Sequence, residues 1–123
     1  MKKLYVSDLD GTLLNQRGDI SATTAEKLNT CIEQGIAFTI NTARTPATTF
    51  PIMASVNLQI PFSMMNGVLV YDPGQQDYLE VHSLSRETAM VILGVIKLYG
   101  LQCFMYTMEH GTMSVSYTHL RAH

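Results

Sequence analysis

Two carboxylates near the N-terminus have the spacing of a small cation site. Asp8 and Asp10 are separated by one residue and follow a short β-type run, Leu4 to Ser7. On an extended segment, side chains at positions i and i+2 project to the same side, so both carboxylates can address one site. Their oxygens suit a hard divalent cation. Acid and glycine clusters are also ordinary turn formers, but the complete string Asp-x-Asp-Gly-Thr directly after a β-type run favours a chemical role.

Two further polar segments follow predicted strands. Thr42 comes directly after the β-type run Ile36 to Asn41, and Asn66-Gly67 follows the run Phe62 to Met65. In open α/β sheets, ligands bind outside the carboxyl ends of the strands. A hydroxyl, an amide and backbone N–H groups are donors that hold phosphate oxygens. Each segment alone has an ordinary reading, as a strand-end cap or a turn, but their common position predicts a phosphate site.

The pattern between these segments predicts an α/β sheet. A helix from about Ala22 to Gln34 lies between the first two β-type runs, and this connection is long enough for a right-handed parallel crossover. A second helix begins at Pro46, where proline is favoured, and ends loosely near Val56 because a second proline interrupts it. Turn signals then predict a β-hairpin over Val68 to His82.

The pattern changes at Ser85. This serine and the two residues after it predict the N-terminus of a helix that runs to about Tyr99, and a new strand begins at Leu101. We therefore expect one domain over residues 1–84 and the first elements of a second domain over residues 85–114.

Composition excludes several classes of protein. The chain has 123 residues, is 46% hydrophobic and 15% charged, and carries a formal charge of −2. It has no basic block, so we expect no nucleic-acid partner. The most apolar stretch, Ala89 to Leu101, contains a lysine and is shorter than the roughly 18 residues that span a membrane. With no apolar core for a signal peptide, we expect a cytoplasmic protein with no membrane partner.

The last nine residues, Val115 to His123, show neither capping residues nor a useful periodicity. They resemble one reading frame of a transposase-type sequencing adapter translated as protein. We therefore expect residues 115–123 to be a non-native tail; the alternative is a genuine frayed terminus.

Three segments together resemble one enzyme superfamily. The string from Val6 to Leu14 resembles motif one of the haloacid dehalogenase-like (HAD) phosphatases, and Thr42-Ala43-Arg44 is similar to their motif two. The segment from Asn66 to Asp72 resembles the Asn-Gly segment of the Cof-type subfamily. The resemblance covers residues 1 to about 114 and departs at Ala43, where glycine is usual. It implies an α/β fold: a Rossmann-like parallel sheet core of the HAD type, incomplete here, with the start of an inserted α/β cap domain at Ser85.

The resemblance implies a magnesium-dependent phosphatase for small phosphorylated metabolites, such as sugar phosphates or phosphorylated cofactors. Asp8 would be the nucleophile and form an aspartyl phosphate. Asp10 would be the general acid and base, which requires a raised pKa. Mg²⁺ would be held by Asp8 and by Asp10 through its backbone carbonyl. Thr42 would hydrogen-bond the transferred phosphoryl group. The other candidate substrate-binding and phosphate-binding residues are Arg44, Asn66, Gly67, Leu9 and Gly11. Arg44 has a second reading, as a solvated surface cation.

Part of the superfamily's site has no counterpart here. The superfamily completes its site with a lysine and acidic metal ligands downstream of the cap, and Lys97 lies in the predicted cap helix. We therefore expect an N-terminal fragment that is itself inactive or nearly so. One alternative is a phospho-accepting receiver-like signalling domain, although receivers place the acceptor on a later strand than their acid pair. Another alternative is a truncated fragment with no present function.

Overall fold

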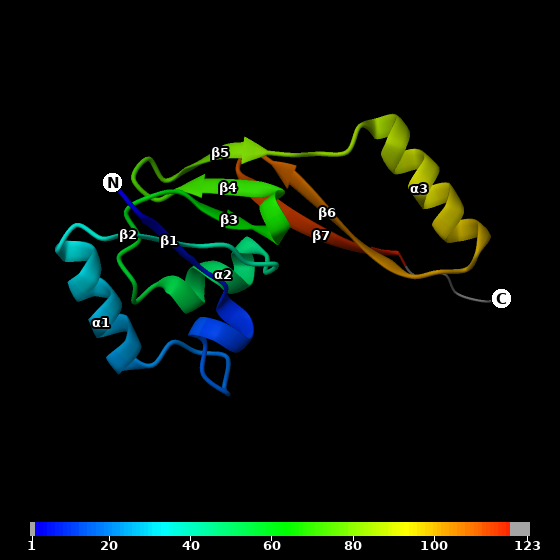
Figure 1. Ribbon diagram of the computed structural model, residues 1–123. Helices are drawn as coiled ribbons and strands as arrows, with labels where there is room; N and C mark the ends of the chain where they lie inside the picture. The colour runs from blue at the N-terminus through cyan, green and yellow to red at the C-terminus, as the bar shows by residue number, and fades with distance from the viewer. Residues whose placement is uncertain (1, 119–123) are drawn as a thin grey trace. The chain divides into compact units, whose positions relative to one another are not determined.

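The first unit of the fold is built on a parallel pair of strands (Figure 1). Strand β1 (Leu4–Ser7) lies parallel to β2 (Ala37–Ile40). Helix α1 (Ala22–Glu33) connects them and begins where the hydroxyl of Ser21 accepts the backbone N–H of Thr24 at 3.1 Å. The structure is a computed structural model that describes residues 2–118. This part confirms the predicted strand, helix and parallel strand.

The next three strands continue the first unit as an antiparallel sheet. Helix α2 (Pro46–Met53) leads from β2 to β3 (Phe62–Met64), and β3 lies parallel to the end of β2 through a bridge between Asn41 and Ser63. Strands β4 (Leu69–Asp72) and β5 (Asp77–Val81) follow in the order β3-β4-β5. Strands β1, β2 and β3 therefore end at the same edge of the unit, and the predicted hairpin is present.

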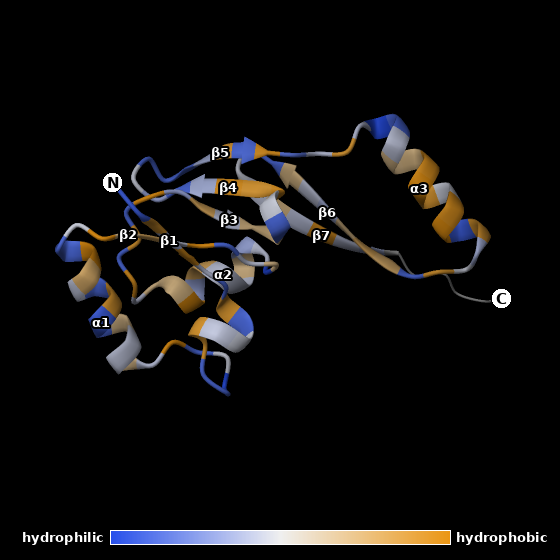
Figure 2. Cartoon of the chain, viewed as in Figure 1, coloured by the Kyte–Doolittle hydropathy of each residue, from blue (hydrophilic) through white to orange (hydrophobic). Residues whose placement is uncertain are grey.

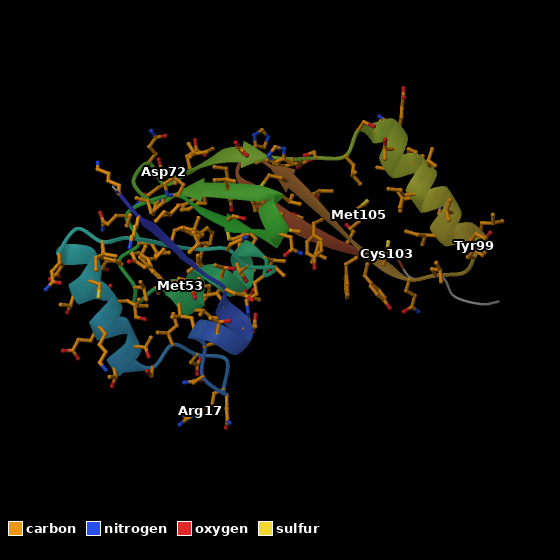
Figure 3. The ribbon with its side chains drawn as sticks, viewed as in Figure 1. Arg17, Met53, Asp72, Tyr99, Cys103 and Met105 are labelled. Atoms are coloured by element: carbon orange, nitrogen blue, oxygen red, sulfur yellow. The ribbon has the colours of Figure 1, made fainter. Side chains whose placement is uncertain are left out.

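The core of this unit lies between the strands and α2. Register places Phe62 opposite Tyr71, and the ring of Phe50 from α2 makes edge contacts with both, with ring centroids 6.1 and 4.9 Å away. Met53 of α2, labelled in Figure 3, is also buried. The remaining buried apolar residues are Leu9, Leu14, Ala25, Ile40, Val56, Met64 and Leu69. Because this core fixes β2 and β3 against α2, it also fixes the loops that leave these strands.

The second unit begins after His82 and is described by itself. Helix α3 (Arg86–Leu98) starts at Ser85, whose hydroxyl accepts the backbone N–H of Thr88 at 3.1 Å. Strands β6 (Cys103–Glu109) and β7 (Thr112–Thr118) form an antiparallel hairpin. Helix α3 is apolar over most of its length (Figure 2), and many of its side chains are exposed. No helix within residues 2–118 is long and apolar enough to cross a membrane.

Strand β7 extends into the segment that we expect to be a non-native tail. Val115 pairs with Tyr106, and Thr118 pairs with Cys103. The start of the tail was expected to have no useful periodicity, but serine alternates with valine and tyrosine over 114–117. This alternation suits a strand, because branched and aromatic side chains pack well on a pleated surface. Residues 119–123 lie outside the described residues. The origin of 115–123 and the domain limits 1–84 and 85–114 stay predictions.

Candidate active site

Asp8 stands at the carboxyl end of β1 in a fixed orientation. Its backbone is extended, with φ −76° and ψ 166°, and its Oδ1 accepts the backbone N–H of Leu9 at 2.7 Å. Leu9 is fully buried in the core, so the N–H that orients the carboxylate is itself held in place. The hydroxyl of Ser7 donates to the backbone carbonyl of Asp8 at 2.8 Å. One carboxylate oxygen of Asp8 is therefore held by the backbone, and the other can meet a ligand.

Asp10 lies in a single wide turn, Leu9–Leu13, closed by a hydrogen bond from Leu14 N–H to Leu9 O at 3.0 Å. Gly11 in this turn has φ +75°, a conformation that side chains rarely adopt. Arg44 donates to both carboxylate oxygens of Asp10, from Nε at 2.8 Å and from Nη2 at 2.7 Å. The pair joins the turn after β1 to the loop after β2.

This pairing corrects one expectation about Asp10. The hydrogen bonds and the charge of Arg44 hold the pKa of Asp10 below its usual value, whereas a general acid was expected to have a raised pKa. The same contacts raise the pKa of Arg44. The pKa shift of Asp10 is downward because Arg44 is bonded directly to Asp10. In this state Asp10 is a carboxylate.

Thr42 ties the ends of β2 and β3 together. Only 2% of this residue is exposed, and its Oγ1 accepts the backbone N–H of Arg44 at 3.1 Å. Its backbone N–H donates to Ser63 O at 3.1 Å, and its carbonyl accepts the N–H of Asn66 at 3.1 Å. Asn66 and Gly67 adopt positive φ angles of 55° and 92°, which asparagine and glycine tolerate best. This bonding places the Asn-Gly turn beside the end of β2.

A pocket of about 410 Å³ lies at this edge of the first unit. Its lining residues are Val6, Ser7, Asp8, Asn41, Ala43 and Asn66. Two of the predicted site residues, Asp8 and Asn66, therefore meet in one cavity. The lining does not include the Asp10–Arg44 pair, Thr42, Leu9, Gly11 or Gly67. Ala43 lines the pocket where the superfamily usually has glycine, so its methyl group takes space beside Asp8.

Asn41 is a pocket residue that the sequence reasoning missed. It is exposed, it lines the pocket with Asp8, and its Oδ1 accepts the hydroxyl of Ser63 at 2.9 Å. The available signal was its position, because a polar residue stands between a buried strand and Thr42.

The oxygen donors near Asp8 fit a hard cation only in part. Within residues 2–118, no three His, Cys, Asp or Glu side chains form a cluster that could hold a metal ion. Both side-chain oxygens of Asp10 are taken by Arg44. The second carboxylate oxygen of Asp8 and the backbone carbonyl of Asp10 are oxygen ligands of the kind that Mg²⁺ accepts, with the rest of its shell coming from water and phosphate.

A larger groove of about 830 Å³ lies elsewhere on the first unit. It is lined by aromatic rings of α2, β3 and β4 and by residues that precede β3, among them Asn57 and Leu58. Residues before β3 lie at the amino ends of the parallel strands, opposite the edge that carries Asp8. Glu33 is the one charged side chain among the residues that line this groove, so the lining has no pair of charged groups for catalysis. The groove is therefore not the candidate site, although it is larger than the pocket at Asp8.

Comparison with known proteins identifies the family. The sequence model of the haloacid dehalogenase-like hydrolases matches residues 5–121. The 5-amino-6-(5-phospho-D-ribitylamino)uracil phosphatase YwtE of Bacillus subtilis is 31% identical over 109 residues, which are 88% of this chain and 37% of that protein. The chain thus spans well under half the length of this relative.

Solved structures agree with this fold. A haloacid dehalogenase-like hydrolase from Bacteroides thetaiotaomicron superposes with a TM-score of 0.74 and 25% identity, over 86% of this chain and 41% of that one. BT1666 from the same organism, described as a phosphatase of the HAD superfamily, gives a TM-score of 0.77 over 98% of this chain and 43% of its own, and at 18% identity it shows the fold alone. The predicted α/β fold and resemblance are confirmed: this chain belongs to the haloacid dehalogenase-like hydrolase family.

Proposed function

We propose that the protein carrying this chain is a magnesium-dependent phosphatase that hydrolyses small phosphorylated metabolites through an aspartyl phosphate. One observation carries the proposal: Asp8 lines the 410 Å³ pocket with one carboxylate oxygen held by the Leu9 N–H. A fixed carboxylate in a pocket is arranged for nucleophilic attack. A pocket of this size is in the usual range, about 300–1,000 Å³, for small-molecule sites. The relative YwtE is named as a phosphatase, which supports the same reaction class.

The reaction divides into two steps at Asp8. In the first, an oxygen of Asp8 forms a bond to phosphorus while the bond from phosphorus to the leaving oxygen breaks. In the second, water attacks the aspartyl phosphate and releases inorganic phosphate, so the Asp8 carboxylate is restored. When bound, Mg²⁺ would be held by Asp8 and the Asp10 carbonyl and would offset the repulsion between carboxylate and phosphate.

Asp10 can act as general acid and base in this reaction only if its two hydrogen bonds to Arg44 break. A phosphate group competes well for a guanidinium, because it accepts the same paired hydrogen bonds as a carboxylate. Phosphate binding would draw Arg44 from Asp10, and the pKa of Asp10 would rise. Asp10 would then take up a proton from solvent, give it to the leaving oxygen and later take one from the attacking water. Arg44 is thus both a substrate contact and a switch on Asp10.

Thr42 and the Asn66-Gly67 turn complete the proposed phosphate site. The hydroxyl of Thr42 accepts one hydrogen bond and keeps its own proton to donate. Asn66 lines the pocket and offers an amide. Leu9, Gly11 and Gly67 contribute backbone rather than side-chain groups. The Leu9 N–H is already used by Asp8, so its part is to orient the nucleophile.

The test is phosphate release by the complete gene product with an aryl phosphate and Mg²⁺. Asp8→Asn keeps the shape and the acceptor for Leu9 N–H but removes the nucleophile, so we expect turnover to be abolished. Asp77→Asn is a matched control, because exposed Asp77 accepts the N–H of its own neighbour, Tyr78, at 2.8 Å. We expect this control to keep full activity. Turnover retained in Asp8→Asn would remove Asp8 as the nucleophile.

A further inference from the structure

A row of polar residues crosses three neighbouring strands at the pocket. Ser7 pairs with Ile40 in parallel register, and the N–H of Asn41 donates to Ser7 O at 2.9 Å. The next position on each strand is therefore Asp8 opposite Asn41. Asn41 in turn bridges Ser63 on β3. Residues that share a register position project from the same face, on strands about 4.8 Å apart, so the side chain of Asn41 is the neighbour of Asp8.

The amide of Asn41 has a defined direction. Its Oδ1 accepts the hydroxyl of Ser63 at 2.9 Å, which leaves the NH₂ group as the free end. Across residues 2–118, this NH₂ group donates to no protein acceptor. Asn41 is exposed and lines the pocket with Asp8 and Asn66. The pocket thus has an oriented, unused hydrogen-bond donor beside the carboxylate.

We propose that Asn41 is a substrate-binding residue whose NH₂ group donates to a phosphoryl oxygen held against Asp8, and that Ser63 is a positioning residue that fixes this amide. The inference rests on the proposed phosphatase function and adds a residue to its site. The residue type fits the place: a guanidinium beside Asp8 would take both of its carboxylate oxygens, as Arg44 takes those of Asp10, and would block attack. An uncharged donor can hold the phosphoryl group and leave the nucleophile available.

Thr42 and Asn41 have separate roles at the end of β2. Thr42 follows Asn41 on the chain, so its side chain leaves the opposite face of the strand, and it is 2% exposed. The exposed donor at the end of β2 is Asn41. The two residues would approach the phosphoryl group from different sides, and their variants should differ.

The test compares substitutions at Asn41 in the complete gene product. Asn41→Ala removes the donor, and we expect kcat/KM to fall about 10- to 100-fold, as for loss of a hydrogen bond to a charged group. Asn41→Asp keeps the shape and the bond to Ser63 but points an anion at the phosphate, so its loss should be larger. The inhibition constant of inorganic phosphate should rise in the same order. Ser63→Ala frees the amide to turn, so we expect a smaller loss, about 3- to 10-fold.

The matched control is Asn57→Asp, which makes the same chemical change in the exposed loop before β3, at the other end of the strand. It should keep kcat/KM within about twofold, since surface changes away from a site have small effects. Thermal unfolding checks that all variants fold. Asn41 variants that match this control, while Asp8→Asn is inactive, would overturn the inference and leave the phosphatase proposal standing. A wild-type protein that neither hydrolyses aryl phosphates nor binds phosphate would overturn both.

Discussion

At the scale of single residues, the sequence predicted the positions of residues that directly follow strands. It missed a bond between two residues that lie far apart in the chain. Asp8 and Asn66 follow strands, and strand ends can be located from the β-type runs, so both were expected at one edge and both line the pocket. The bond between Asp10 and Arg44 joins residues that are 34 positions apart. Its geometry depends on the Gly11 turn and the loop after β2, which no local pattern encodes. For this reason the expected upward shift of the Asp10 pKa was wrong, and the pKa is lowered.

The bond to Arg44 gives a direct prediction for the titration of Asp10. In Arg44→Gln, we expect the pKa of Asp10 to rise toward its ordinary value of 3.8, because the two hydrogen bonds and the positive charge are gone. The pKa is measured by NMR from the carboxyl carbon of Asp10. Because the folded-state pKa of Asp10 is lowered, the Asp10–Arg44 pair stabilises the fold at pH values above the unfolded-state pKa of Asp10. This stabilisation is lost as the pH falls through the folded-state pKa.

The control for this titration is Arg86→Gln, which removes the same charge from the start of α3 in the second unit. We expect it to leave the pKa of Asp10 unchanged. An Asp10 pKa that stays the same in Arg44→Gln would show that the paired geometry does not hold in solution.

At the scale of elements, capping residues and turn residues were the reliable signals. Helix α3 is capped by Ser85, as predicted, and α1 is capped by Ser21 in the same way. Both serines accept the backbone N–H three residues on at 3.1 Å. Helix α2 ends at Met53, soon after the internal proline. The sequence did not predict the wide turn Leu9–Leu13, in which Leu9 is fully buried in the core. Long-range packing, rather than propensity, decides such a turn.

The cap of α1 predicts a measurable loss of stability. Ser21→Ala removes the oxygen that accepts the Thr24 N–H, so we expect the free energy of unfolding to fall by about 1 kcal/mol. Urea denaturation of the complete gene product measures the change. Ser55→Ala is the control: among the described residues the Ser55 hydroxyl makes no hydrogen bond, and its backbone carbonyl, which the substitution keeps, accepts from the Asn29 amide at 2.9 Å. Equal stability of Ser21→Ala and the control would contradict the capping role.

At the scale of the whole molecule, apolar surface explains the composition. The chain is 46% hydrophobic, yet Leu4, Tyr5 and Val6 on β1 are more than half exposed, as are Leu98 and Tyr99 at the end of α3. The sequence predicted a change of pattern at Ser85, and the structure divides after His82, where the β-hairpin closes with a bond from His82 N–H to Val68 O at 2.8 Å. Composition could show that the chain is unusually apolar, but only the fold shows which faces remain open.

In the proposed reaction, Asp8 becomes phosphorylated during turnover. The direct measurement is an acid quench of the complete gene product with substrate and Mg²⁺, reduction of any acyl phosphate with borohydride, and mass spectrometry of the peptides. We expect that Asp8 alone is converted to the reduced residue, and that Asp8→Asn shows no conversion while Asp77→Asn behaves as the wild type. Conversion of a different carboxylate, or none during active turnover, would contradict the proposed reaction.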